Sequence, residues 1–373
     1  MRISEVKAEI LRHDLDVTIR DAQISIPSRI ILLVRVRTDD GMEGYGEAGT
    51  FGGAEHTIKT IIDTQLAPML IGEDPTLIER HWARMYQGTI QLGRRGAMIA
   101  AISGIDIALW DILGKIAGLP VYKLLGGRTS VVPAYASAGF YSDGKGLEGL
   151  NDEFAIISSK GYRAAKMKVA GEDFDADVER VRIAREALGS GSGLMVDSNN
   201  QHSPREAIEF ARQIEDLHIA WFEEPTRTDD IDGMAMVRNS ISIPVAGYET
   251  ETTRHGFRLL IEAGCVDVLQ PDTVWAGGIT ECHRISALAS AHHLPVAPHN
   301  YAGAISGFSN LHVLAAAPTG HSFEMDQNPN PLRTDLTDSW PEIDAESQVH
   351  ISDRPGLGFS LNEEVVERYR VDG

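Results

Sequence analysis

Eight short apolar segments follow one another in the second two thirds of the chain, and each ends in a polar residue. These residues recur every 23 to 31 positions, at Ser137, Lys168, Asp197, Glu223, Glu249, Asp272, His299 and Glu324. A short, mostly apolar segment is typical of a strand that is buried on both faces. One strand, one helix and two short loops fill about this length, so the series predicts a closed (β/α)8 barrel rather than an open doubly wound sheet.

Helix signals lie between these strands. Residues 203–217 begin with SPRE, which places Ser203 as the N-cap, Pro204 at the first helical position and Glu206 as the partner in a capping box. In a later strand–helix unit, the helix that begins near Thr253 is expected to end at Gly264. The alternation of strand and helix therefore continues through the segment.

The first third of the chain predicts a different kind of domain. Its strands are expected at 5–13, 30–37 and 42–47, the last two joined by the turn Asp40-Gly41, and its helices at 55–70, 75–86 and 96–117. We therefore expect an α+β capping domain at residues 1–125, a catalytic barrel at 126–328, and a C-terminal segment at 329–373 that packs back on the capping domain.

Composition limits the classes of partner. With 54 acidic and 34 basic side chains the formal net charge is -20, which repels nucleic acid and anionic membranes. The N-terminus lacks a signal pattern, and the most apolar helix candidate is interrupted by Asp106 and Asp111. Cys265 and Cys282 are too few for a disulfide scaffold. We expect a cytoplasmic protein with no nucleic acid or membrane partner.

Three successive strand ends carry carboxylates, Asp197, Glu223 and Glu249. In a barrel the C-terminal ends of the strands converge on one site. Three converging carboxylates repel one another unless a hard cation neutralises them, and oxygen ligands without His or Cys favour Mg2+ over zinc. Solvated acids at loop starts are the alternative in so acidic a chain. We predict a magnesium site at these three residues.

Lys166 and Lys168 lie on the strand before Asp197, and residues two apart on a strand point to the same face. We expect both to face the barrel interior, where Lys166 and the cation lower the pKa of Lys168 so that it acts as a base. Across the barrel, Asp272 beside His299 is expected to form a general acid or base pair. Glu324 is placed to hydrogen-bond a substrate oxygen.

The strand ends carry short motifs: KMK at 166–168, VDSN at 196–199, WFEEP at 221–225, VAGYE at 245–249, QPD at 270–272, APHN at 297–300 and SFEMD at 322–326. With GYGEAGTFGG and SGIDIALWDILGKIAGLPVYKLLGG before the barrel, this set resembles the enolase superfamily, mandelate racemase subgroup, over essentially the whole chain. The resemblance implies a modified (β/α)7β barrel and a homo-oligomer, either a dimer or an octamer.

By the resemblance, Asp197, Glu223 and Glu249 are metal ligands, Lys168 is the first base and Lys166 tunes it. Asp272 with His299 is the second acid or base pair, Glu324 is a hydrogen-bonding acid, and Asn199 binds substrate. Members of that superfamily use a Lys or His base with Mg2+ to stabilise an enediolate. Tyr248 and Ser198 depart from the family pattern.

Two loops of the capping domain, 17–27 and 49–56, are expected to set specificity. They contain polar residues, among which we assign Arg20 and His56 to substrate binding, and this favours a polyol acid over an aromatic ring. We therefore expect a Mg2+-dependent dehydratase of a small carboxylate substrate, an aldonate or aldarate, that forms a 2-keto-3-deoxy acid. The alternatives are a racemase, epimerase or lactone cycloisomerase on the same scaffold, and a non-catalytic sugar-acid binding barrel.

Overall fold

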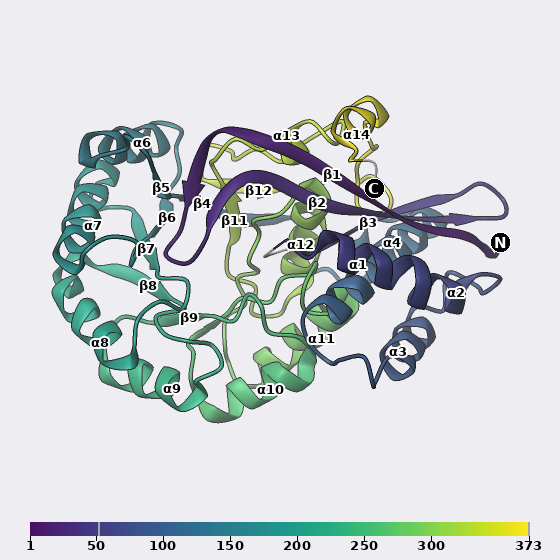
Figure 1. Ribbon diagram of the computed structural model, residues 1–373, viewed down its shortest axis with the longest axis horizontal. Helices are drawn as coiled ribbons and strands as arrows, with labels where there is room; N and C mark the ends of the chain where they lie inside the picture. The colour runs from purple at the N-terminus through teal and green to yellow at the C-terminus, as the bar shows by residue number, and fades with distance from the viewer. Residues whose placement is uncertain (51–52, 372–373) are drawn as a thin grey trace.

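The computed structural model describes residues 1–50 and 53–371. Its N-terminal part is a four-stranded sheet of order β3-β2-β1-β5 covered by helices (Figure 1). The strands are β1 (Ile3–Arg20), β2 (Ser25–Thr38), β3 (Glu43–Ala48) and β5 (Tyr141–Ser142), and the helical segments are α1 (Glu55–Ile61), a π-helical turn (Ile62–Leu66), α2 (Ala67–Leu70), α3 (Ile78–Gly88), α4 (Ala97–Ala117) and α5 (Val121–Leu124).

The β1–β2 hairpin is much longer than the sequence predicts. β1 continues to Arg20 and β2 begins at Ser25, so the expected loop at 17–27 is a hairpin end with a turn at 21–24. Figure 1 shows this hairpin reaching from the capping domain across the barrel. The sequence predicts a shorter strand because the far half of β1 is exposed and largely polar, so that it lacks an alternating apolar pattern.

Both faces of β2 are buried, and successive side chains serve different cores. Ile31 and Leu33 join the core shared with the barrel, whereas Leu32 and Val34 join the core beneath the helices. α4 lies against β3, where Gly44 and Gly46 bring the strand backbone directly against the helix. α4 is long and apolar enough to cross a membrane, but 83% of its most apolar window is buried inside the protein, as in a core helix.

The barrel consists of parallel strands in the order expected. They are β4 (Val131–Ala138), β6 (Ala164–Lys168), β7 (Gly193–Asp197), β8 (Ile219–Glu223), β9 (Val245–Gly247), β10 (Val268–Leu269), a single bridging residue at Val296, and β11 (Phe323–Asp326). Val296 bridges to Leu269 on one side and Gly320 on the other, and β11 pairs with β4, so the ring closes. This confirms the predicted barrel fold.

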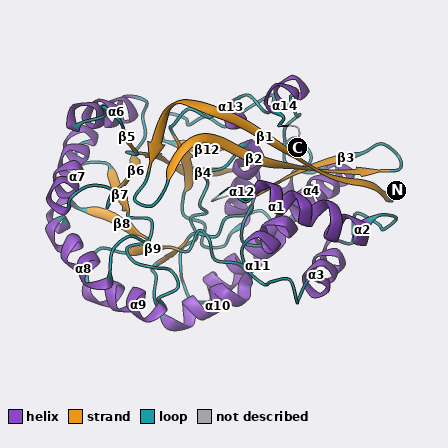
Figure 2. Cartoon of the chain, in the orientation of Figure 1, coloured by secondary structure: helices purple, strands orange, loops and turns teal. Residues whose placement is uncertain are grey.

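Helices surround the ring, as Figure 2 shows. They are α6 (Leu147–Ser159), α7 (Phe174–Leu188), α8 (Pro204–Gln213) with a 3-10 turn (Glu215–Leu217), α9 (Ile231–Ser240), α10 (Thr253–Ala263), α11 (Gly278–Ala291) and α12 (Ala304–Ala316). Within the continuously described stretch 131–326, seven of these helices alternate with the eight strand positions, which is the (β/α)7β form. The capping box of Ser203 and Glu206 and the left-handed C-cap at Gly264 form as predicted.

The last part of the chain returns to both domains. α13 (Pro331–Thr334) follows the barrel, β12 (Gln348–His350) pairs antiparallel with β4, and α14 (Glu363–Tyr369) packs on β1. Arg35 of β2 forms two hydrogen bonds of 2.7 Å with Glu363, and Arg370 bridges to Leu11 through the backbone. The C-terminal segment therefore contacts both the capping sheet, at β1 and β2, and the barrel, at β4.

Candidate active site

The predicted side chains meet at the C-terminal end of the barrel. Lys168, Asp197 and Glu223 are neighbours in register across β6, β7 and β8. The remaining members follow from their strands: Lys166 on β6, Glu249 after β9, Asp272 after β10, His299 after the bridge at Val296, and Glu324 on β11. Beneath them, Tyr135, Met195, Trp221, Ala246, Val268 and Ala297 fill the barrel interior.

The two lysines are each placed among carboxylates. Lys166 donates to Glu223 and lies 2.8 Å from Glu324, and Lys168 donates to Asp197 at 2.5 Å. Burial is the largest single influence and lowers the pKa of Lys168, but the carboxylates of Asp197, Glu249 and Asp21 together raise it by more, so that the net pKa is raised. The predicted depression of this pKa is therefore not seen, because in the protein alone each ammonium is the counter-ion of a buried carboxylate.

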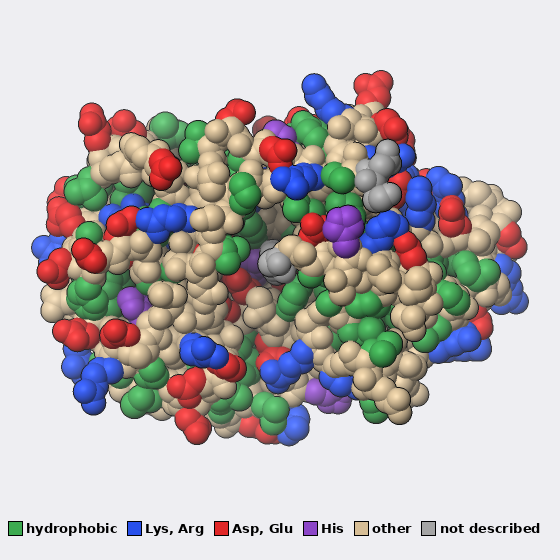
Figure 3. Space-filling view, in the orientation of Figure 1, with side chains coloured by type: hydrophobic (Ala, Val, Ile, Leu, Met, Phe, Trp, Pro, Cys, Tyr) green, Lys and Arg blue, Asp and Glu red, His purple; other side chains and the backbone are tan. Residues whose placement is uncertain are grey.

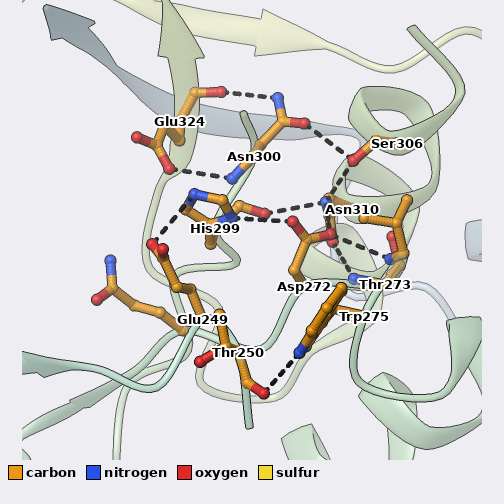
Figure 4. Close-up of polar contacts among 12 residues, drawn as sticks. Glu249, Thr250, Asp272, Thr273, Trp275, His299, Asn300, Ser306, Asn310 and Glu324 are labelled. Atoms are coloured by element: carbon orange, nitrogen blue, oxygen red, sulfur yellow. Dashed lines mark hydrogen bonds and ion pairs between the residues drawn. The ribbon is translucent and has the colours of Figure 1, made fainter. Parts of the chain in front are cut away.

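His299 lies between two carboxylates, as Figure 4 shows. Its Nδ1 is 2.9 Å from Asp272 Oδ2, and its Nε2 is 3.2 Å from Glu249 Oε2. Burial alone lowers the pKa of His299, but the Glu249 charge and the hydrogen bond to Asp272 raise it to about 10. This raised pKa favours the protonated imidazole, which can donate a proton.

Among residues 1–50 and 53–371, no three His, Cys, Asp or Glu side chains are grouped closely enough to hold a metal ion. Asp197 and Glu223 turn their oxygens to the lysines, and Glu249 turns to His299. The predicted metal triad therefore stays a prediction, and its arrangement in the protein alone is explained by pairing with the neighbouring cations.

The donor chemistry nevertheless fits a hard divalent cation. The three carboxylates come from successive strand ends and offer only oxygen. The buried Asn199 Oδ1 has no hydrogen bond among the described residues, and Glu249 Oε2 has only its ion pair with His299. The eight predicted side chains comprise five acids and three cationic groups, so two negative charges are left over: the acids are Asp197, Glu223, Glu249, Asp272 and Glu324, and the cations are Lys166, Lys168 and His299.

Left-handed backbone is concentrated at this edge of the barrel. Asn199, Glu224 and Tyr248 have φ angles of 42°, 39° and 76°. Glu224 Oε1 accepts the backbone N–H groups of Tyr248 and Glu249 at 2.9 and 3.1 Å, and Ser198 Oγ donates to the Glu224 carbonyl. Such strain persists only where surrounding contacts enforce it. The Ser198 hydroxyl and the Tyr248 backbone thus belong to the hydrogen-bond network around Glu224, which also holds the Glu249 backbone.

Several residues that hold the site were not identified from the sequence. Gln270 and Trp221 donate to Glu223 Oε2 at 2.7 and 3.1 Å. Asn300 donates its backbone N–H to Glu324 Oε2 at 3.0 Å. Each lies inside a motif that already marked the site, namely QPD, WFEEP and APHN. Because these residues lie in the same motifs as the assigned ones, the sequence could have identified them as part of the site.

A cavity of about 1380 Å³ opens above these side chains. Lys168, Asn199, Glu249 and His299 line it from the barrel, and the tip of the β1–β2 hairpin lines it from the capping domain. Figure 3 shows a hollow near the middle of the molecular surface in this view, with acidic and basic side chains interspersed around it. Lys168 and His299 thus face the same space. Among the predicted catalytic and metal-ligand side chains, those that do not line it are Lys166, Asp197, Glu223, Asp272 and Glu324.

The structure does not bring Arg20 and His56 to the wall of this cavity. The Arg20 guanidinium donates to Gly171 O at 2.7 Å, pairs with Glu172 and lies over the Tyr141 ring, so it docks the hairpin on the barrel. His56 is exposed in the first turn of α1. From the second predicted loop, Thr50 and Gly53 line the cavity. Phe51 and Gly52 of that loop lie outside the described residues.

Known proteins place this architecture in a family. Residues 8–126 match the model of the mandelate racemase/muconate lactonizing enzyme N-terminal domain, and residues 151–365 match the model described as enolase C-terminal domain-like. An arabinonate dehydratase of Saccharolobus solfataricus is 41% identical over 340 residues, covering 91% of this chain and 90% of that protein. A D-galactarolactone cycloisomerase of Agrobacterium fabrum is 34% identical, covering 100% and 99%.

Solved structures agree over the whole length. The crystal structure of a racemase from Streptomyces coelicolor with bound magnesium has a TM-score of 0.92 and 30% identity to this chain, covering 99% of this chain and 100% of that chain. The sequence matches include both the capping and the barrel parts. The chain therefore belongs to the enolase superfamily, within its mandelate racemase/muconate lactonizing enzyme group.

Proposed function

We propose that this protein is a Mg2+-dependent dehydratase that converts a sugar acid, an aldonate or aldarate, to a 2-keto-3-deoxy acid. The observation that carries the proposal is that Lys168 and His299 line one cavity from different strands. A base and an acid on either side of a substrate are what removal of an α-proton and a β-hydroxyl requires. The arabinonate dehydratase relative supports the same reaction class.

Asp197, Glu223 and Glu249 are the residues that would hold Mg2+. When bound, the ion supplies positive charge against the negative charge that develops on the substrate carboxylate as the α-proton leaves. The two surplus negative charges of the site and its oxygen-only donors support this assignment. The magnesium in the Streptomyces coelicolor neighbour supports it as well.

The chain's own residues then carry the proton transfers. Lys168 in its neutral form takes the proton from the α-carbon, and the C–H electron pair passes into the enediolate. His299 gives its Nε2 proton to the β-hydroxyl as the C–O bond breaks, so water leaves and an enol remains. The enol tautomerises to the keto acid. Lys166 keeps Glu223 and Glu324 compensated, while Glu324 and Asn199 are proposed to contact substrate oxygens.

An isomerase is the second candidate. The D-galactarolactone cycloisomerase relative covers the whole chain, and its similarity favours a reaction that shares the α-proton transfer. In that case His299 would deliver a proton to carbon instead of expelling a hydroxyl. The two reactions therefore differ in the fate of the enediolate and not in how it forms.

One screen separates them. Aldonic acids, aldaric acids and their lactones are incubated with the protein and Mg2+ in D2O, and proton NMR follows keto acid formation and deuterium uptake at the α-carbon. We expect a 2-keto-3-deoxy product from one or a few stereoisomers. Deuteration or lactone rearrangement without water loss would assign the isomerase, and inertness toward all of these acids would contradict both.

We further propose that the protein acts in the cytoplasm as a homo-oligomer. The family resemblance supports a dimer or an octamer. Light scattering on the purified protein after size-exclusion chromatography measures the mass directly. A monomeric mass at micromolar concentration would contradict the proposed assembly.

A further inference from the structure

α12 runs beside the Asp272–His299 pair and is buried along its whole length. Its polar side chains include Asn310, which is fully buried and lies two turns from the end of the loop that carries His299. A buried amide requires partners for its N–H groups and its oxygen. Apart from a 3.4 Å contact with Ser306 Oγ on the same helix, the partners of the Asn310 side chain belong to the catalytic edge.

One amide group contacts both members of the pair. Asn310 Nδ2 donates to Asp272 Oδ1 and to the His299 carbonyl, each at 3.0 Å. Its Oδ1 accepts the Thr273 backbone N–H at 2.9 Å. Figure 4 shows these bonds converging from α12. Asn310 thereby links the two strand ends that supply Asp272 and His299.

The geometry of Asp272 depends on this link. Its Oδ2 faces His299 Nδ1 at 2.9 Å, and its Oδ1 is held by Asn310 and by the Val274 N–H at 3.1 Å. Fixing Oδ1 fixes the plane of the carboxylate. Since a carboxylate only accepts, His299 Nδ1 donates and Nε2 is directed toward Glu249 and the cavity.

The helix that carries Asn310 is itself anchored from the capping domain. Glu47 of β3 accepts the backbone N–H groups of Gly303 at 2.7 Å and Ser306 at 3.0 Å, at the N-terminus of α12. Asn310 is one turn beyond Ser306 on that helix. Asn310 therefore lies on a helix whose N-terminus is held in place by hydrogen bonds, and not on a loop.

We infer that Asn310 is a positioning residue that fixes the Asp272 carboxylate and the His299 backbone together, so that Nε2 faces the reacting carbon. The inference rests on the proposed role of His299 as the acid. A contact that orients an acid is worth about 10- to 100-fold in rate. Its loss should slow the step that uses His299 and spare the step that uses Lys168.

The test compares Asn310→Leu with a control on the same helix, His312→Leu. His312 is also buried, and it contacts Tyr122 N and Leu357 O, away from the pair. For Asn310→Leu we expect kcat for dehydration to fall about 10- to 100-fold with KM within about threefold, while Lys168-dependent exchange of the α-proton in D2O persists. His312→Leu should leave the ratio of dehydration to exchange unchanged.

A folded Asn310→Leu protein that dehydrates within about threefold of wild type, or that loses exchange and dehydration equally, overturns the inference. If that variant does not fold, Asn310→Ser, which is too short to span both partners, is measured in the same way. The hydrogen-bonded Nδ1–H proton of His299, assigned with His299→Asn, gives a readout that needs no turnover. It should shift or broaden in the Asn310 variant only, and an unchanged resonance contradicts the inference even if wild type acts on no sugar acid.

Discussion

Pairing between opposite charges explains the two adjacent lysines of β6. Lys166 lies within ion-pair distance of Asp197, Glu223 and Glu324, and Lys168 pairs with Asp197. These carboxylates are buried, so an uncompensated charge would be costly. Both lysines are thus needed to compensate the charge of the buried carboxylates, whatever part they have in catalysis.

Metal removal tests the carboxylate cluster. Excess EDTA should abolish turnover, because the charge of the enediolate is uncompensated without the cation. Added Mg2+ should restore turnover. Mg2+ should also raise the melting temperature of the native protein, since it binds only the folded state. The Asp197→Asn variant should not show this rise in melting temperature. Asp63→Asn, in the π-helical turn of the capping domain, is the control and should show it. Full activity in EDTA rules the site out.

His299→Asn tests the acid. The variant keeps a polar side chain but has no proton to give at Nε2, so dehydration should fall by about 10²- to 10⁴-fold. α-Proton exchange by Lys168 should continue, measured as deuterium uptake by NMR. His350→Asn, at a histidine that pairs with Asp344 and does not line the cavity, should have little effect on either rate. Undiminished dehydration by His299→Asn would assign the acid elsewhere.

At the scale of elements, β3 and α4 pack through their backbones. A Cβ at Gly46 would overlap the carbonyl oxygen of Gly104, and one at Gly44 would overlap that of Ala108. Glycine is therefore required here by close approach and not by its φ angle. The motif GYGEAG serves this contact, and the same strand supplies Glu47, which caps α12.

Gly46→Ala should consequently destabilise the capping domain. The strand and helix must separate to admit the methyl group, which costs about 1 to 3 kcal/mol of unfolding free energy. Urea denaturation followed by circular dichroism measures the change. Gly191→Ala is the matched control, because a Cβ there meets nothing within 4 Å and the backbone is not left-handed. Equal stability of the two variants would show that the helix can move freely.

Across the whole molecule, the capping domain supplies carboxylates to the N-termini of two barrel helices. Glu47 caps α12, and Asp106 of α4 accepts the backbone N–H and the hydroxyl of Thr280 on α11. These helices follow the strand ends that carry Asp272 and His299. Burial raises the pKa of Asp106 to about 7 even though the Thr280 hydrogen bonds lower it.

This raised pKa predicts how stability depends on pH. The folded state binds the Asp106 proton more tightly than the unfolded state, whose pKa is near 3.8, so folding is favoured most below that value. The contribution of Asp106 to stability should decline as pH rises toward about 7 and then level off. The contribution is roughly 2 to 4 kcal/mol. Unfolding free energies of wild type and Asp106→Asn between pH 4 and 8 should differ in slope over this range, and parallel curves would contradict the assignment.

The sequence by itself determined the barrel, the order of its strands and the residues at their ends, because strand periodicity, helix caps and turns are local patterns. Ser203 with Glu206 and the motif at Asp197 are read within a few residues. Tertiary structure alone decided the length of the β1–β2 hairpin, the docking of Arg20 on Tyr141 and the contact of Asn310 with Asp272. These depend on which residues far apart in the chain become neighbours, and on how buried charges pair once water is excluded.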